Sequence, residues 1–258
     1  MQYAVCCVPV SPIKKEPFHN AEMISQQLFG EQCTVLEMIP GWIKIRCKYD
    51  NYEGWSQSGH LVEIDEDQFA NTNKKLASGW INEVSYNGEK MFVPFGSSLA
   101  TFKKDNAVWN SNLINYKGKK YNPPGGKINK KNIKWISGKY LNTSYLWGGK
   151  SVFGIDCSGF TQSVYKFLNI YLPRDSWQQA ELGDTVDHLH GTNCGDLCFF
   201  ENEEGRITHV GLLLNNHTII HSSGKVRIDK IDNVGIINSD TGQQRTHKIK
   251  LIKRYFSG

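Results

Sequence analysis

One cysteine stands where a helix is expected to begin. Cys157 lies in the stretch GIDCSGFTQSVYKFL (154–168), between an aspartate and a serine. The apolar residues after it recur at helical spacing, which predicts an amphipathic helix with Asp156 as its N-cap residue. Unpaired N–H groups in a first helical turn favour an anion, so we expect the pKa of the thiol to fall from about 8.5 toward neutrality. Position alone leaves two interpretations, a nucleophile or a small buried apolar residue.

Two histidines offer the base that a thiol nucleophile needs. The segment ITHVGLLLNNHTIIH (207–221) reads as two strands joined by a polar turn. If a three-residue loop, 214–216, joins the strands, His209 pairs directly with His221 on one face of the hairpin. His217 is then expected in the exposed turn and receives no role.

These three residues suit acyl transfer through a thioester. Cys157 is the predicted nucleophile, His209 the general base and then the general acid, and His221 the residue that fixes the tautomer of His209. The alternative is two core histidines and a packed cysteine, and the residues alone leave both interpretations open.

A second group of cysteines and histidines superficially suggests zinc. His188, His190, Cys194 and Cys198 have the spacing H-x-H-x3-C-x3-C, which matches no standard structural zinc site. Cys198 also lies in the apolar run LCFF, which reads as a strand. We therefore expect buried cysteines, no metal and no cofactor.

Composition narrows the class of protein. The 258 residues, 39% of them apolar, are enough to bury a sizeable core, and a net charge of +5 is too mild to indicate nucleic acid as a partner. The sequence shows neither a membrane span nor an export signal. The seven cysteines are odd in number, and Cys6 and Cys7 are adjacent, which favours a reducing compartment. We expect the cytoplasm; the alternative is a periplasmic or exported protein whose signal has been removed.

The charge and the residue pattern divide the chain into three predicted domains, 1–68, 69–126 and 127–258. The first is acidic, with five basic and ten acidic side chains. The first two read as small β-barrels, and the third has helical signals followed by strands, so the predicted class is α+β. The predicted strands include CTVLEMI (33–39) and WIKIRC (42–47) in the first domain, and WINEV (80–84), MFVPF (91–95) and LATF (99–102) in the second.

Ordered motifs carry a resemblance to a known family. YLWGGKSVFGIDCSGF (145–160), PRDSWQQA (173–180), CGDLCFF (194–200) and HVGLLL to IIH (209–221) resemble the NlpC/P60 cysteine peptidases, and SQQLFGE (25–31) with YDNYEGW (49–55) resembles bacterial SH3 domains. The resemblance implies a papain-like catalytic domain preceded by two SH3-like β-barrels. It also implies cleavage of the γ-D-glutamyl bond to a diamino acid in cell-wall peptides.

The resemblance also assigns roles to residues. Cys157, His209 and His221 occupy the family's Cys-His-His positions, and Tyr145 matches a tyrosine that completes the oxyanion hole with the Cys157 backbone N–H. Core packing is the alternative for Tyr145, and Trp147 either lines the cleft or packs.

The domain order resembles the YkfC-like subgroup, which acts on released murein peptides with a free N-terminal L-alanine. This implies that Asp156, Ser158 and Ser176 help to bind the substrate amine. The first SH3-like domain is then expected to add Tyr52 and a glutamate, for which the candidates are Glu22 and Glu53. Helix capping by Asp156 and ordinary surface hydrogen bonding by the others are the alternatives.

The function predicted from sequence is that of a γ-D-glutamyl-L-diamino acid endopeptidase of peptidoglycan recycling. We expect a monomer whose partner is the small peptide substrate, with no nucleic acid and no membrane. Two alternatives remain, a cell-wall-binding module whose papain-like part is dispensable, and an amidase or acyltransferase on the same scaffold.

Overall fold

The computed structural model describes residues 1–124, 128–240 and 244–256. The chain forms two compact units, Met1–Pro123 with Trp147–Val152, and Pro124–Leu146 with Phe153–Gly258. The first unit is mostly strands and the second combines helices with a sheet, so the predicted α+β class is confirmed. The predicted boundary between residues 126 and 127 lies outside the described residues, and the one between 68 and 69 stays a prediction.

The N-terminal module of the first unit is a seven-stranded antiparallel sheet. Its strand order is β3-β2-β6-β5-β4-β1-β7. The predicted strands 33–39 and 42–47 are confirmed as β4 and β5, which meet at Gly41, where a φ of 79° suits glycine. Alternating apolar residues of these strands, among them Ile13, Ile43 and Ile45, form a buried core. The strands are β1 (Tyr3–Cys6), β2 (Val10–Lys14), β3 (Met23–Leu28), β4 (Gln32–Ile39), β5 (Trp42–Cys47), β6 (Glu53–Gln57) and β7 (Leu61–Ile64).

The second β-module of the first unit pairs its strands in the order β10-β9-β12-β11, with β8 and β13 as a separate pair. The predicted strands 80–84 and 91–95 are confirmed as β9 and β10, but the predicted strand 99–102 is wrong. Phe102 N–H donates to the Leu99 carbonyl at 3.1 Å, so this stretch turns and places its apolar side chains in the core. The elements are α1 (Glu66–Ala70), β8 (Leu76–Ala77), β9 (Ile81–Tyr86), β10 (Glu89–Pro94), β11 (Asn106–Trp109), β12 (Asn112–Tyr116) and β13 (Lys120–Tyr121).

The two β-modules share one hydrophobic core. Phe29 of the first module packs against Trp109 of the second with ring centroids 5.0 Å apart, and Phe102 lies in the same cluster. Since fully burying one large apolar side chain contributes about 1.5–3 kcal/mol, this shared core ties the modules into one unit.

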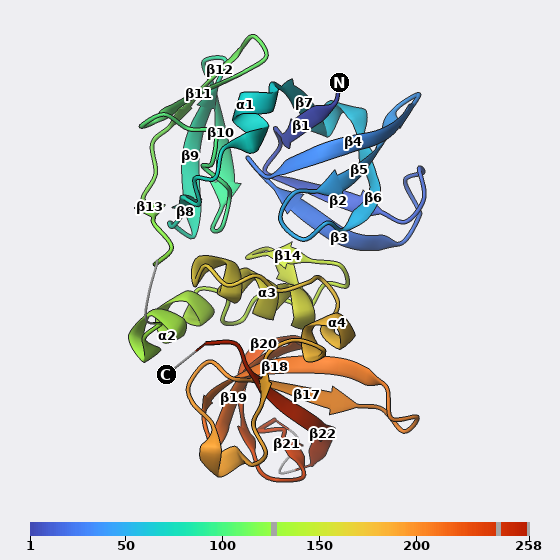
Figure 1. The fold of residues 1–258 in the computed structure, drawn as a ribbon, viewed down its shortest axis with the longest axis vertical. Helices are drawn as coiled ribbons and strands as arrows, with labels where there is room; N and C mark the ends of the chain where they lie inside the picture. The colour runs from blue at the N-terminus through green and yellow to red at the C-terminus, as the bar shows by residue number, and fades with distance from the viewer. Residues whose placement is uncertain (125–127, 241–243, 257–258) are drawn as a thin grey trace. The chain divides into compact units, whose positions relative to one another are not determined.

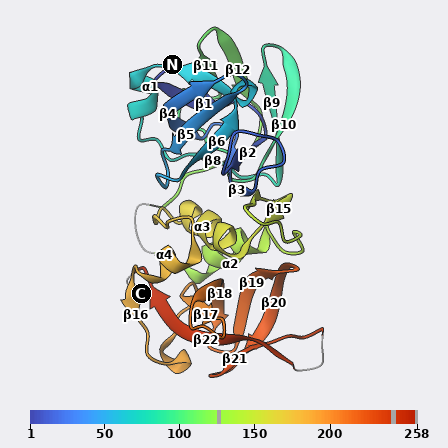
Figure 2. The same cartoon turned by 90° about the vertical axis from the view of Figure 1, so that its right-hand side faces the viewer.

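In the second unit, helices lie on one side of a strongly curved sheet (Figures 1 and 2). The strand order is β16-β22-β17-β18-β19-β20-β21, and β21 also pairs with β22, which closes six of the strands into a barrel. The elements are α2 (Lys130–Gly138), β15 (Gly154–Ile155), α3 (Cys157–Phe167), α4 (Ser176–Ala180), β16 (Asp184–Thr185), β17 (Leu197–Glu201), β18 (Ile207–Asn215), β19 (Thr218–Ser223), β20 (Lys225–Ile231), β21 (Gly235–Ile237) and β22 (Arg245–Arg254).

Helix α3 begins where the sequence predicts it. Its apolar stripe, Phe160, Val164 and Phe167, is fully buried, and the helix packs on β18 and β19. This packing fixes the start of α3 beside the strands that carry the predicted histidines. In the described part of the chain, no helix has both the length and the hydropathy of a membrane span.

Candidate active site

The start of α3 presents Cys157 as the first helical residue. The Asp156 carboxylate accepts a hydrogen bond from the Gly159 N–H at 2.7 Å, so the predicted N-cap is confirmed. The first N–H groups of a helix have no partner within it, and that of Cys157 is therefore available to a ligand. Cys157 itself is 8% exposed.

The two predicted histidines are in contact. His209 Nε2 lies 2.9 Å from His221 Nδ1. The predicted register is wrong, however, because Gly211, not His209, pairs with His221. A bulge between Leu213 and Asn215 moves the pairing by two positions, which keeps both histidines on one face as diagonal neighbours. His217 lies in the exposed turn, as predicted.

Helix α3, which begins at Cys157, packs on β18, the strand that carries His209. The backbone N–H of Val210, the residue that follows His209 on β18, is among the groups that lower the pKa of the Cys157 thiol. The cysteine and the imidazole pair, which are far apart in the sequence, are therefore brought together by the packing of α3 on the sheet. Their catalytic roles stay predictions.

The predicted fall in the pKa of Cys157 is wrong. Burial, and then the carboxylate of Asp156, raise the pKa of the thiol to about 12 despite the hydrogen bond from Val210. Burial, with His221 and His247 adding to it, lowers the pKa of His209 well below its usual value. The resting pair is thus a neutral thiol and a neutral imidazole, and a proton must pass to His209 when the sulfur attacks.

Tyr145 lies within electrostatic reach of Cys157. Its N–H donates to the Gly224 carbonyl at 2.9 Å, and a bridge joins it to Ile155, two residues before the cysteine. Burial, followed by Cys157 and Asp156, raises the pKa of the phenol to about 12. The hydroxyl therefore stays protonated at neutral pH and can donate a hydrogen bond.

Asp156 and Ser158 are held by a buried arginine, Arg174, to which the sequence motifs assign no role. Arg174 donates to both oxygens of Asp156, at 3.1 and 2.5 Å, and to the Ser158 hydroxyl at 2.8 Å. The arginine comes from the PRDS segment, and Ser176 of the same segment is the half-buried first residue of α4. Arg174 thus links Asp156 and Ser158, two of the residues predicted to bind the substrate amine.

Trp147 belongs to the first unit, where its ring N–H donates to Glu22 at 2.9 Å. The next residue, Gly148, has a φ of 76°, and a Cβ there would lie 2.5 Å from the Met23 carbonyl oxygen, so glycine is required. Together with β14 (Lys150–Ser151), this segment packs against β3 of the N-terminal module.

The other two residues assigned to amine binding in the first SH3-like domain lie side by side in the sequence at the start of β6. Tyr52 is half-buried just before β6, and the Glu53 carboxylate pairs with Arg46 at 2.7 Å. The substrate contacts predicted for Tyr52, for Trp147 and for either glutamate stay predictions.

Three further residues surround the histidines without any signal in the local sequence. Asp229 on β20 lies 3.0 Å from His221 Nε2, and Arg227 pairs with Asp229. The His247 ring on β22 packs against that of His209 with centroids 4.2 Å apart. Alternation within their strands gives the face on which these residues lie, but only the sheet order brings them to the histidines.

The alternative zinc group does not assemble. Cys198 is a fully buried residue of β17, as its apolar run predicts, and within residues 1–124, 128–240 and 244–256 no three His, Cys, Asp or Glu side chains could hold a metal ion.

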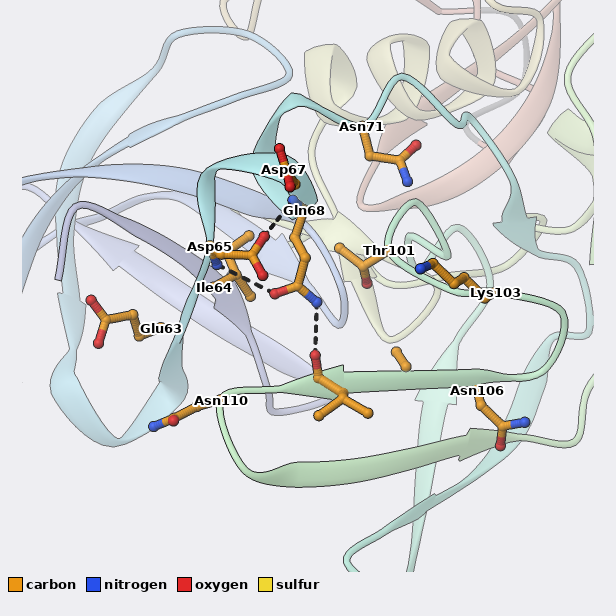
Figure 3. A pocket seen from close by; sticks show the side chains of 12 residues that line it. Glu63, Ile64, Asp65, Asp67, Gln68, Asn71, Thr101, Lys103, Asn106 and Asn110 are labelled. Carbon is orange, nitrogen blue, oxygen red and sulfur yellow. Dashed lines mark hydrogen bonds between the residues drawn. The ribbon is translucent and has the colours of Figure 1, made fainter.

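A pocket of about 800 Å³ in the first unit contains none of the predicted catalytic residues (Figure 3). It lies between α1 and β11, where Gln68 donates to the Val108 carbonyl at 2.7 Å and its own N–H donates to Asp65. Asp65 and Gln68 form the capping box of α1, which accounts for the polar groups at its centre.

Comparison with known proteins agrees with both resemblances, to NlpC/P60 peptidases and to bacterial SH3 domains. Residues 142–245 match the NlpC/P60 family model, and residues 13–61 match the bacterial dipeptidyl-peptidase SH3 domain model. The chain is 28% identical to a gamma-D-glutamyl-L-lysine dipeptidyl-peptidase of Bacillus cereus (strain ATCC 10987 / NRS 248), over 86% of this chain and 74% of that protein. It is 23% identical to dipeptidyl-peptidase 6 of Lysinibacillus sphaericus, over 89% and 92%.

A solved structure has the same fold along nearly the whole chain. It is an NlpC/P60 family protein from Bacillus cereus ATCC 10987, with a TM-score of 0.79 and 20% identity, covering 98% of this chain and 99% of that one. The predicted fold, a papain-like domain behind SH3-like barrels, is confirmed. Residues 142–245 thus match an NlpC/P60 domain and residues 13–61 a bacterial dipeptidyl-peptidase SH3 domain, the two resemblances that the motifs indicated.

Proposed function

We propose that this chain is a cysteine peptidase that hydrolyses the γ-D-glutamyl bond to a diamino acid in small murein peptides with a free N-terminal L-alanine. One observation carries the chemistry, the packing of α3, which begins at Cys157, on β18 and β19, the strands that hold the His209–His221 pair. The similarity to a gamma-D-glutamyl-L-lysine dipeptidyl-peptidase and to dipeptidyl-peptidase 6 supports the choice of bond.

In the acylation step, His209 takes the thiol proton while the Cys157 sulfur attacks the carbonyl carbon. The C–N bond of the tetrahedral intermediate then breaks, and the proton on His209 passes to the leaving amine. Because burial keeps His209 neutral beforehand, its lone pair is available near neutral pH.

Developing negative charge on the carbonyl oxygen needs donors that are already in place. The Cys157 backbone N–H at the start of α3 is one, and the Tyr145 hydroxyl is the other. In the second half of the reaction, water gives a proton to His209 and attacks the thioester, the C–S bond breaks, and the sulfur regains its proton.

Selection of a free amine requires acceptors for an ammonium group, since burying such a group without them is costly. We assign this contact first to Asp156. Because Arg174 already offsets the charge of Asp156, one carboxylate does not supply the whole attraction. A second acidic group is expected for this reason, and Glu22 and Glu53 stay the predicted candidates.

We further propose that the protein works in the cytoplasm on peptides released during peptidoglycan recycling. All seven cysteines lie in the described residues and are free thiols, which suits a reducing compartment.

The test compares L-Ala-γ-D-Glu-L-lysine and L-Ala-γ-D-Glu-diaminopimelate with their N-acetylated forms. Cleavage of the free-amine peptides only, between glutamate and the diamino acid, supports the proposal. Equal cleavage of both forms removes the amine-selection part, and tight binding to sacculi without hydrolysis favours a wall-binding module instead.

Two cysteine variants serve as controls for this test. Cys157→Ala should abolish turnover without unfolding the protein. Cys194→Ala, which removes a half-buried cysteine outside the proposed site, should keep it. Turnover by Cys157→Ala near the wild-type rate would reject the nucleophile.

A further inference from the structure

The histidine pair continues into a buried carboxylate. Asp229 is 3% exposed, and one of its oxygens lies 3.0 Å from His221 Nε2. Across β18, β19 and β20, Gly211 pairs with His221, and His221 pairs with Arg227. His209 lies two residues from Gly211 on β18, and Asp229 lies two residues from Arg227 on β20. Both are therefore diagonal neighbours of His221 on the same face of the sheet.

Arg227 and Ser239 also hold the Asp229 carboxylate, and both donate hydrogen bonds to it. Arg227 donates to its two oxygens at 2.7 and 3.0 Å, and Ser239 donates through its N–H at 3.1 Å and its hydroxyl at 2.8 Å. Burial opposes ionisation, but the hydrogen bonds from His221, Arg227 and Ser239 outweigh it and hold the pKa of Asp229 well below its usual range. The group is thus a carboxylate, which only accepts hydrogen bonds.

The guanidinium of Arg227 is itself held in place beside Asp229 by further hydrogen bonds. It also donates to Asp240 at 2.6 Å and to Asn238 at 2.9 Å. A guanidinium stays charged at any working pH, so the carboxylate keeps its counter-charge.

An acceptor at this position dictates where the protons lie on both rings. His221 must carry its proton on Nε2 to donate to Asp229, which leaves the lone pair of the neutral ring on Nδ1. That nitrogen faces His209 Nε2 at 2.9 Å, so His209 must donate from Nε2. The neutral His209 ring then has its lone pair on Nδ1, the only ring nitrogen left to receive the thiol proton.

The opposite arrangement would disable the base. If His221 carried its proton on Nδ1, it would donate to His209 Nε2, and a neutral His209 would hold its proton on Nδ1. His209 could then offer no lone pair to the sulfur, and a bare His221 Nε2 would face the carboxylate of Asp229.

We propose that Asp229, ionised and oriented by Arg227, is a positioning residue that sets the tautomers of both His221 and His209 so that His209 Nδ1 is the base for Cys157. This inference rests on the proposed role of Cys157 and His209 in hydrolysis. Its tests include measurements that do not use the proposed peptide substrate.

The first test uses the unmodified protein. Nitrogen-15 NMR of the histidine rings near neutral pH should show the proton on Nε2 in both His209 and His221. A proton on Nδ1 of His209 in the resting protein would overturn the proposal. The measurement uses the wild-type protein, so its result does not depend on the folding of any variant.

The second test replaces one carboxylate oxygen of Asp229 with an amide nitrogen. Asp229→Asn keeps the shape of the side chain but can present an N–H to His221, which favours the disabling tautomers. We expect kcat to fall on the order of 10³-fold with little change in KM, since the comparable change in a Ser-His-Asp triad costs about 10⁴-fold. Alkylation of Cys157 by iodoacetamide, followed by mass spectrometry at one pH, should slow as well.

Asp232→Asn is the matched control. Asp232 also pairs with an arginine, Arg245, and accepts from the Val234 N–H, but none of these contacts involves the histidines. This variant should keep the tautomers and the alkylation rate. If the folded Asp229→Asn protein behaves in the same way, the proposal is wrong. If wild type does not cleave the peptides yet Asp229→Asn shifts the tautomers and slows alkylation, this inference holds and the substrate proposal fails.

Discussion

Replacing Arg174 by methionine should strongly destabilise the second unit. The guanidinium is 2% exposed and donates to both oxygens of Asp156 and to the hydroxyl of Ser158. Methionine fills most of the same space without the charge. The carboxylate of Asp156, itself 5% exposed, would then keep its charge in a buried position without its cationic partner.

The size of the effect follows from that stranded charge. Removing one partner of a buried ion pair typically costs about 3–5 kcal/mol. Asp156→Asn in the same chain removes the charge and keeps an acceptor for the Gly159 N–H at the helix start. The double variant should therefore be more stable than the sum of the two single effects predicts, by about 0.5–3 kcal/mol.

Urea unfolding of all four proteins, followed by circular dichroism, gives the free energies of unfolding for this cycle. Arg206→Met is the control, because Arg206 pairs with Glu204 at 3.2 Å while both side chains are well exposed. Such a surface pair contributes about 0–1 kcal/mol. The reasoning fails if Arg174→Met costs no more than Arg206→Met.

Three other predictions follow from the same site. Tyr145→Phe should lower kcat by about 10²–10³-fold with KM nearly unchanged, as expected for loss of one oxyanion donor; steady-state kinetics within twofold of wild type would remove that role. In His209→Ala, which lacks the base, the rate of Cys157 alkylation by iodoacetamide should keep rising from pH 8 to pH 10, because burial raises the pKa of the thiol to about 12; a plateau near neutrality would contradict that raised pKa. Burial, and then the neighbouring His221, lower the pKa of His247 to about 4, so the stabilising contribution of the neutral His247 ring is complete above pH 6.5 and is lost as the pH falls through 4. His247→Gln, which leaves His209, His221 and Asp229 facing the new side chain, should flatten the fall in melting temperature over that pH range; an unchanged slope would contradict it.

The sequence was sufficient to predict elements that depend on local pattern. The apolar stripe that ends at Phe167 and the capping aspartate Asp156 predict α3, because both signals lie within one helix. The β4–β5 hairpin was predicted because alternation and the turn at Gly41 agree. The prediction of a strand at 99–102 was wrong because these residues form a turn, although their apolar side chains are buried in the core.

What the sequence could not supply depends on long-range packing. Alternation predicted the face shared by His209 and His221. The bulge at Leu214 does not alter the apolar pattern of the sequence, so the predicted register of the two strands was wrong. The pKa of Cys157 was wrong for a related reason, because the burial that outweighs the helix N-terminus arises from the whole fold. Asp229 was missed because its relation to His221 exists only across two strands.

The central claim is that Cys157 forms a covalent thioester with the acyl half of the peptide. The direct measurement is rapid acid quenching during turnover of the free-amine peptide, followed by mass spectrometry of the digested protein. The account predicts an added L-Ala-γ-D-Glu acyl group on the peptide that contains Cys157, and on no other cysteine. Turnover that proceeds at full rate without any such adduct, or with the adduct on a different residue, would contradict it.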